Sequence, residues 1–194
     1  MVKAAGCAFA AIVADRSVVT WGDEYLVRDQ LKGVQQIQAS RFAFAAILED
    51  GSVVPWGESD NHSDTSEDGS VVTWGESDEG GDSSAVADQL QGVKHIQAAA
   101  CGAFAAILED GSVVTWGRAD KGGDSSAVRD QLKGVRQIQA THGAFAAILE
   151  DGSVVSWGCK LHGGDSSAVR DQLRGVQHIQ GTCDSGRWIC HYLG

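Results

Sequence analysis

The sequence predicts an all-β protein assembled from repeated three-stranded units. A segment from Gly102 to Gly117 returns almost letter for letter at Gly143 to Gly158. The copies end at Trp-Gly pairs, whose tryptophans are Trp21, Trp56, Trp74, Trp116 and Trp157. The last three lie 42 and 41 residues apart, a period that is typical of propellers and solenoids. We therefore expect a β-propeller, closed or incomplete and open, of about four to five three-stranded blades with short helical turns between strands.

Two strands of each unit are predicted to form a hairpin. In the cleanest copy, the apolar runs Ala103–Leu108 and Val113–Trp116 flank the turn sequence Glu109-Asp-Gly-Ser112. Asp-Gly between two such runs favours a type I′ turn, in which both central residues have positive φ. In the first copy Arg16 follows Asp15 where the other copies have glycine. We therefore expect the first hairpin to be less ideal than the others.

A short helix and a third strand are predicted to complete each unit. Residues 120–126 have the composition of a loop, and Ala127–Lys133 has the spacing of a short helix. Asp124 or Ser125 can cap this helix, and Gly134 can end it. Val135–Ala140 then alternates as a strand. Three short strands cannot bury a core alone, so the units must stack.

The repeat array is expected to cover residues 1–182, and residues 183–194 form a tail outside the repeat. The array is uneven, because Trp56 lies 35 residues after Trp21 and only 18 before Trp74. The acidic stretch 58–67 replaces part of a blade and is predicted to be a loop. The chain starts near an Ala-Phe-Ala-Ala-Ile strand and its last repeat strand ends at Gln180. One hypothesis is that this last strand completes the first blade and covers its edge.

Composition disfavours several classes of function. The net charge of −11 argues against nucleic-acid binding, which depends on Lys and Arg. No run approaches the roughly 18 apolar residues of a membrane span, so no membrane partner is expected. Five cysteines without a Cys-x-x-Cys pair suggest neither a disulfide framework nor a zinc site. Ala8–Ile12 recurs mid-chain, which favours a repeat strand over a signal peptide. We expect an intracellular protein, cytoplasmic or nuclear.

The motif Asp-Gly-x-Val-x-x-Trp-Gly, followed by a glycine six residues after the tryptophan, resembles the repeat of the regulator of chromosome condensation family. The motif is clearest at Asp110–Gly117 and Asp151–Gly158, and the later glycines are Gly80, Gly122 and Gly163. The family's Gly-Gln-Leu-Gly loop is replaced here by Gly-Gly-Asp-Ser-Ser. The resemblance implies a β-propeller, typically seven-bladed. Its members include an exchange factor for a small GTPase, accessory domains of HECT-type ubiquitin ligases, a plant photoreceptor and a β-lactamase inhibitor, and they share protein binding through propeller loops.

Together these observations predict a non-catalytic protein-binding or scaffolding module, with no cofactor, no metal and no catalytic residue. Its partner is an unidentified protein, and open blade edges favour self-association. The alternatives are an exchange-factor-like regulator of a small GTPase, a regulatory fragment of a HECT-type ligase, and an inert repeat fragment. One turn position varies while its surroundings repeat, which is expected either of drift in a loop or of a protein-binding site. It holds Arg41, Cys101, His142 and, on the same alignment, Cys183.

Three other groups of residues are interpreted as structural. The tryptophans are expected to pack the blades. The aspartates around Gly-Gly, such as Asp120 and Asp124, are expected to cap helices rather than to bind calcium. His95 and His178 stand where other copies have glutamine and are interpreted as sequence drift.

Overall fold

Four three-stranded antiparallel sheets make up the computed structural model, which describes residues 2–5, 8–22, 31–41, 43–49, 51, 53–57 and 80–181. Blade 1 comprises β1 (Val2–Ala5), β2 (Ala8–Ile12) and β3 (Val18–Gly22). Blade 2 comprises β4 (Val34–Ala39), β5 (Ala43–Leu48) and β6 (Val53–Gly57). Blade 3 comprises β7 (Val93–Ala99), β8 (Ala103–Leu108) and β9 (Val113–Gly117). Blade 4 comprises β10 (Val135–Ala140), β11 (Ala144–Leu149) and β12 (Val154–Gly158).

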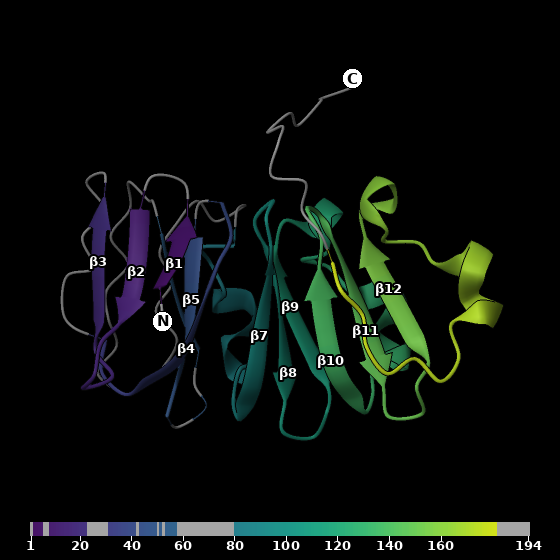
Figure 1. The fold of residues 1–194 in the computed structure, drawn as a ribbon, viewed down its shortest axis with the longest axis horizontal. Coiled ribbons are helices and arrows are strands. Elements are labelled where there is room, and N and C mark those ends of the chain that lie inside the picture. Colours follow the sequence, from purple (N-terminus) through teal and green to yellow (C-terminus); the bar gives the residue numbers. More distant parts are fainter. Residues whose placement is uncertain are drawn as a thin grey trace.

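The four blades follow one another along the longest axis of the molecule, with β3 at one end and β12 towards the other (Figure 1). This arrangement confirms the prediction of an all-β, open propeller. The predicted unit at Trp74, the acidic stretch 58–67 and the tail 183–194 lie outside the described residues.

Short 3₁₀ helices link the blades where the sequence predicts helical turns. The longer ones are η2 (Ser84–Gln89), η4 (Ser126–Gln131) and η6 (Ser167–Gln172), and the shorter ones are η3 (Ala119–Lys121) and η5 (Lys160–His162). An aspartate precedes each longer helix, and its Oδ1 accepts the backbone N–H of the first helical serine. The N–O distances are 2.8 Å for Asp82, 2.8 Å for Asp124 and 3.0 Å for Asp165. The N-cap residue of η4 is Ser125, whose side chain makes no capping hydrogen bond, so Asp124 supports the helix start from one residue further out.

The hairpin turns differ from the predicted type I′ geometry. In the turn of blade 3 only Gly111 has positive φ, at 77°, and Asp110 does not. The amide of Gly111 donates to the carbonyl of Leu108 at 3.0 Å, and Leu108 N–H donates to Ser112 at 3.0 Å. The turn is therefore a longer loop that ends in one left-handed residue. Asp110 stays in an ordinary conformation because its Oδ1 accepts the N–H of Ser112 at 2.8 Å.

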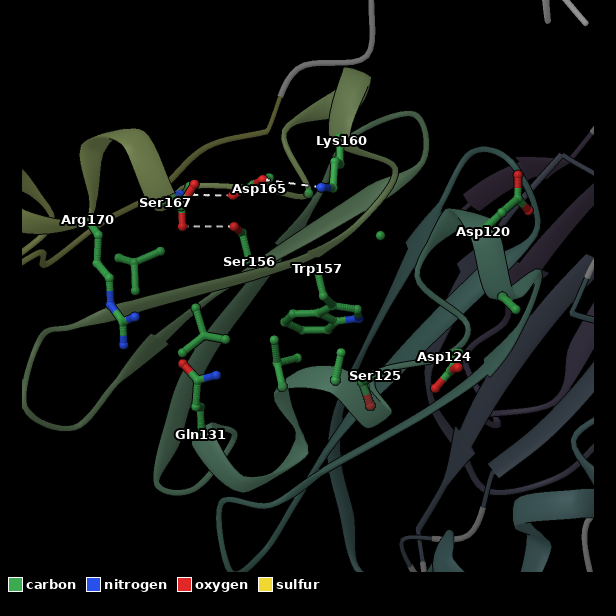
Figure 2. Close-up of a pocket in the computed structure, with 18 residues that line it drawn as sticks. Asp120, Asp124, Ser125, Gln131, Ser156, Trp157, Lys160, Asp165, Ser167 and Arg170 are labelled. Atoms are coloured by element: carbon green, nitrogen blue, oxygen red, sulfur yellow. Dashed lines mark hydrogen bonds and ion pairs between the residues drawn. The ribbon is translucent and has the colours of Figure 1, made fainter. Parts of the chain in front are cut away.

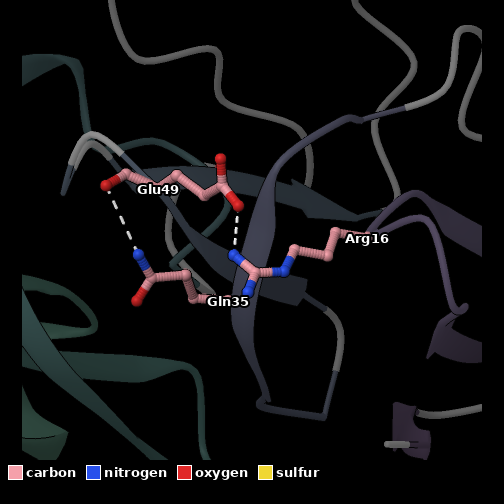
Figure 3. A network of polar contacts seen from close by, with 3 residues as sticks. All are labelled: Arg16, Gln35 and Glu49. Atoms are coloured by element: carbon pink, nitrogen blue, oxygen red, sulfur yellow. Dashed lines mark hydrogen bonds and ion pairs between the residues drawn. The ribbon is translucent and has the colours of Figure 1, made fainter.

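The first hairpin carries the strain that its sequence predicts. Arg16 occupies the left-handed position with φ 62° and is the one non-glycine residue with positive φ in the described part of the chain. Its guanidinium contacts Glu49 Oε1 of blade 2, and Gln35 Nε2 donates to the Glu49 carbonyl at 3.3 Å (Figure 3). Both side chains of the ion pair are more than half exposed, so the pair adds little stability.

We expect Arg16→Gly to raise the free energy of unfolding by about 1 kcal/mol, because glycine adopts left-handed φ without the Cβ clash. Urea denaturation measures the change. Arg16→Ala is the matched control, since alanine keeps the strain and also loses the ion pair. A gain in both variants, or in neither, would contradict the assignment of strain to this φ.

Apolar cores lie between neighbouring blades rather than within them. Alternate residues of each middle strand face opposite ways: Ala103, Ala105 and Ile107 pack on blade 4, and Phe104 and Ala106 pack on blade 2. The core between blades 2 and 3 contains Trp116, and the core between blades 3 and 4 contains Trp157. Each tryptophan is 4% exposed. Phe104 and Trp116 stack with ring centroids 5.2 Å apart, and Phe145 and Trp157 stack at 5.3 Å. The predicted packing role of these tryptophans is confirmed.

Each buried tryptophan also joins its blade to the linker that precedes the blade. Trp116 Nε1 donates to the carbonyl of Gly80 at 3.2 Å, and Trp157 Nε1 donates to that of Gly122 at 3.0 Å. A Cβ at Gly80 would lie 2.7 Å from the Phe104 ring, and one at Gly122 would lie 2.6 Å from the Phe145 ring. The later glycine of the motif is therefore the acceptor and the contact surface for the next blade. We call this contact the interblade joint.

The first blade overturns the hypothesis that the last repeat strand completes it. β1 pairs antiparallel with β2, Ala4 opposite Phe9, and already holds the innermost position. Residues 176–181 instead run beside blade 4, where Val176 N–H donates to Gly152 at 2.9 Å and Gln137 Nε2 donates to Ile179 at 3.4 Å. Val2–Ala5 was missed because it lacks the apolar spacing of Val135 and Ile138.

Candidate functional site

The variable turn positions of three successive blades lie side by side. Each turn joins the innermost strand of a blade to its middle strand. The amide of Arg41 in blade 2 donates to the carbonyl of Ala100 in blade 3 at 3.1 Å, and the amide of Cys101 donates to the carbonyl of His142 in blade 4 at 2.9 Å. We call Arg41, Ala100, Cys101 and His142 the turn row. Cys183, the fourth predicted residue, lies outside the described residues.

The residues of the turn row differ in what they present to solvent. Arg41 is exposed and His142 is partly exposed, so both side chains can reach a binding partner. Cys101 is 4% exposed, so its thiol faces the protein interior. The contribution of Cys101 to a surface is therefore its backbone position rather than its side chain.

The linkers before and after blade 4 bring residues to the turn row that the sequence did not predict, one from η3 and one from η5. The rings of His142 and His162 meet edge to face, with centroids 5.1 Å apart. Thr141 Oγ1 donates to the carbonyl of His162 at 2.8 Å, which holds η5 over the turn. A Cβ at Gly143 would lie 2.8 Å from Lys121 Cδ and 2.9 Å from His162 Nδ1, so a larger residue there would push these side chains aside. Lys121 and His162 therefore border the same turn, although they lie far from it in sequence.

A hydrogen bond and burial shift the pKa values of Lys121 and His162 in opposite directions. Lys121 Nζ lies 2.8 Å from Asp120 Oδ2, and this hydrogen bond raises the pKa of Lys121. Burial lowers the pKa of His162, and the neighbouring His142 and Lys121 lower it further. His162 Nδ1 is enclosed without a hydrogen-bond partner among the described residues. At neutral pH the edge of the turn row therefore carries a cationic lysine beside a neutral imidazole.

Apart from the turn row, a concave region lies between the linkers that flank blade 4. It is a cavity of about 410 Å³ between η4, β12 and η6, with Trp157 in its wall and Gln131 and Arg170 at its rim (Figure 2). Some of its polar groups are paired with each other: Ser156 Oγ and Ser166 Oγ lie 2.9 Å apart, and Asp165 Oδ1 accepts the N–H of Ser167 in the first turn of η6.

The described residues contain neither a metal-binding cluster nor a helix suited to span a membrane. No group of three His, Cys, Asp or Glu side chains is close enough there to hold a metal ion. No helix in the described part of the chain is long and apolar enough to cross a membrane.

His95 gives the fold a predicted response to acid. Burial is the main cause that lowers the pKa of His95, and Lys3 of blade 1 lowers it further. The unfolded chain therefore binds a proton before the folded chain does, so stability is complete above about pH 6.5 and falls as the pH decreases. Gln36 holds the equivalent position in blade 2 and donates to the Ile96 carbonyl at 3.2 Å.

We expect His95→Gln to reduce the loss of stability between neutral and mildly acidic pH, measured by urea denaturation at each pH. Lys3→Gln should reduce it by a smaller amount, because only the repulsion from Lys3 is removed. An acid response that is identical in all three proteins would contradict this origin.

Comparison with known proteins supports the fold. Neither a family model nor a curated protein sequence matches the chain. Among solved structures, Prp20p from Saccharomyces cerevisiae is 16% identical with a TM-score of 0.51, over 81% of this chain and 43% of that chain. Yeast RCC1 (Prp20) bound to Kap60 is 16% identical with a TM-score of 0.50, over 81% and 41%. The chain thus spans less than half the length of these β-propellers, and at this identity the likeness shows the fold alone.

Proposed function

We propose that this chain is a protein-binding or scaffolding module without catalysis, related to the chromosome-condensation regulator repeats, and that the turn row contacts its protein partner. The continuity of the turn row across three blades carries the proposal, because backbone hydrogen bonds at 3.1 and 2.9 Å fix neighbouring turns together. A rigid scaffold that aligns variable turns is a common way to build a binding surface. Prp20p, which has a similar fold, binds Gsp1p and histones, and this precedent supports a protein-binding role.

A comparison of captured proteins tests the proposal. The purified chain is immobilised as the wild type, as an Arg41→Glu/His142→Ser variant, and as an Arg136→Glu/His178→Ser control. The control changes the same residue types at exposed positions outside the turn row. Quantitative mass spectrometry should find proteins that bind the wild type and the control but are depleted at least about tenfold with the turn-row variant, which corresponds to a loss of about 1.4 kcal/mol. Equal capture by all three proteins would refute the role of the turn row.

Two assays test two of the alternatives, the exchange-factor-like regulator and the inert repeat fragment. A purified exchange factor accelerates nucleotide release from a small GTPase, and we expect no acceleration by this chain with any GTPase that it captures. An inert repeat fragment has no cooperative thermal transition, whereas stacked blades with shared cores should melt cooperatively. Accelerated nucleotide release would favour the exchange-factor alternative over the scaffolding proposal. A thermal melt without a cooperative transition would contradict both and favour the inert fragment.

A further inference from the structure

We propose that a second copy of this chain docks head-to-tail, with blade 1 of one copy seated on the exposed end of blade 4 of the other. The proposal is independent of the protein partner at the turn row. It rests on the interblade joint, which is complete twice inside the chain and is present as two separate halves at the ends of the described array.

The complete joints define what each half contains. One half is the stacked Phe-Trp pair of a blade, with an adjacent valine of the outermost strand. Its members are Phe104, Val114 and Trp116 in blade 3, exposed 0%, 7% and 4%, and Phe145, Val155 and Trp157 in blade 4, exposed 1%, 8% and 4%. The other half is the preceding linker, with its acceptor glycine and the apolar residues of its 3₁₀ helix and first strand.

Blade 1 presents the first half without a cover. Phe9 and Trp21 stack with centroids 5.3 Å apart and an interplanar angle of 13°, as in the complete joints. They are nevertheless 42% and 46% exposed, and Val19, which is equivalent to Val114, is 49% exposed. The aromatic pair is thus already in the geometry of a joint while its outer face meets solvent.

The far end of blade 4 presents the second half. Gly163 has φ 97°, close to the 102° of Gly122, but a Cβ there would meet nothing within 4 Å. Val169 of η6 is 43% exposed, whereas its equivalent Val128 packs against a core. Leu173, Val176 and Ile179 are partly exposed, although their equivalents Leu132, Val135 and Ile138 are 3%, 5% and 0% exposed. This linker is thus folded as a joint surface that no Phe-Trp pair covers among the described residues.

A second copy is the occupant that the geometry favours. The two halves lie at opposite ends of the long axis, so they do not meet within one molecule (Figure 1). Each half is shaped for the other, as shown by the two internal joints built from near-identical residues. Different surfaces on the two partners make the contact heterologous, which gives a ring if the rotation closes and a filament otherwise. Two copies contribute eight described sheets, within the four-to-eight-blade range of closed propellers.

The innermost strand decides how the two halves fit. Residues 176–181 occupy the innermost strand position next to blade 4, and β1 occupies the innermost strand position of blade 1. When the two copies dock, only one of these segments can pair with β2, so the other must be displaced. The segment 176–181 is anchored by Val176 to Gly152 at 2.9 Å, and it carries the Val-x-x-Ile spacing of the other innermost strands. β1 has only four residues and lacks this spacing. β1 is therefore displaced, and the shared blade combines residues 176–181 of one copy with β2 and β3 of the other.

Molar mass by sedimentation across a wide concentration range tests the docking with four proteins: the wild type, Val19→Glu, Val169→Glu and a control, Ala85→Glu. All three substituted side chains are exposed, and Ala85 lies on η2 in the middle of the array. The wild type and the control should associate beyond the 20.3 kDa of one chain. Each joint variant should stay monomeric to at least tenfold higher concentration. An equimolar mixture of the two joint variants should regain a dimer and nothing larger, because one intact joint remains.

Three results would overturn the proposal. A wild type that is monomeric at every concentration excludes the docking. Association that survives in either joint variant places the contact elsewhere. A mixture that stays monomeric excludes a head-to-tail joint. Deleting residues 1–5 should tighten association, and loss of association in a deletion variant that still melts cooperatively would overturn the shared blade.

Discussion

Trp157→Ala is expected to lower the free energy of unfolding by about 3–5 kcal/mol, the cost of removing a buried aromatic side chain. Trp157 is 4% exposed, stacks on Phe145 and donates to the carbonyl of Gly122 at 3.0 Å. Its loss leaves a cavity between blades 3 and 4 and an acceptor without its donor. Urea denaturation followed by circular dichroism measures the change.

Two companion variants separate the parts of this effect. Trp21→Ala changes the same residue type at the equivalent position of blade 1, where the ring is 46% exposed, and should cost much less in dilute solution. Trp157→Phe keeps an aromatic ring on Phe145 but removes the indole N–H, and should cost about 1–3 kcal/mol for the unsatisfied carbonyl. Equal losses for Trp157→Ala and Trp21→Ala would contradict the different burial of the two joints.

Gly122→Ala is expected to destabilise the fold by about 2–5 kcal/mol, because two costs add. A non-glycine residue at φ 102° carries the left-handed penalty of about 1–2 kcal/mol, and the new Cβ overpacks the core by about 1–3 kcal/mol. That Cβ would lie 2.6 Å from the ring of Phe145, which is fully buried and cannot move aside cheaply. Thermal and urea unfolding of the purified variant measure the sum.

Gly163→Ala isolates the contribution of the clash. Gly163 has nearly the same φ, 97°, but its Cβ would meet nothing within 4 Å. Only the backbone penalty of about 1–2 kcal/mol should remain. If the two substitutions cost the same in dilute solution, the contact between the linker glycine and the next blade is not as described.

Local sequence patterns predicted the parts of the fold that depend on local chemistry. The strand Val135–Ala140 and the hairpin of β11 and β12 follow from apolar spacing and an Asp-Gly turn. The turn type was wrong because the pattern of two strands and Asp-Gly does not fix how many residues the loop contains. β1 was missed because Val2–Ala5 is held by pairing with β2 rather than by a pattern of its own.

The repeat pattern of the sequence did not predict the contacts between blades. The glycine six residues after each tryptophan is visible as a repeated feature, but its role depends on a tryptophan 35 or 36 residues further along. The turn row shows the same limit. Variation at Arg41 and His142 marked a candidate surface, whereas the burial of Cys101 and the approach of Lys121 and His162 became visible only with the blades stacked.

The central claim is that a hydrogen bond from tryptophan to the preceding linker joins successive blades into one rigid array, which aligns the turn row. The exchange rates of the indole N–H groups of Trp116 and Trp157, measured by nuclear magnetic resonance and assigned with Trp→Phe variants, test it most directly. Both protons are buried and bonded to glycine carbonyls, so they should exchange at least about a hundredfold more slowly than a free indole, a protection of about 2.7 kcal/mol. Exchange of both at the rate of a free indole would contradict the joint and the stacked array built on it.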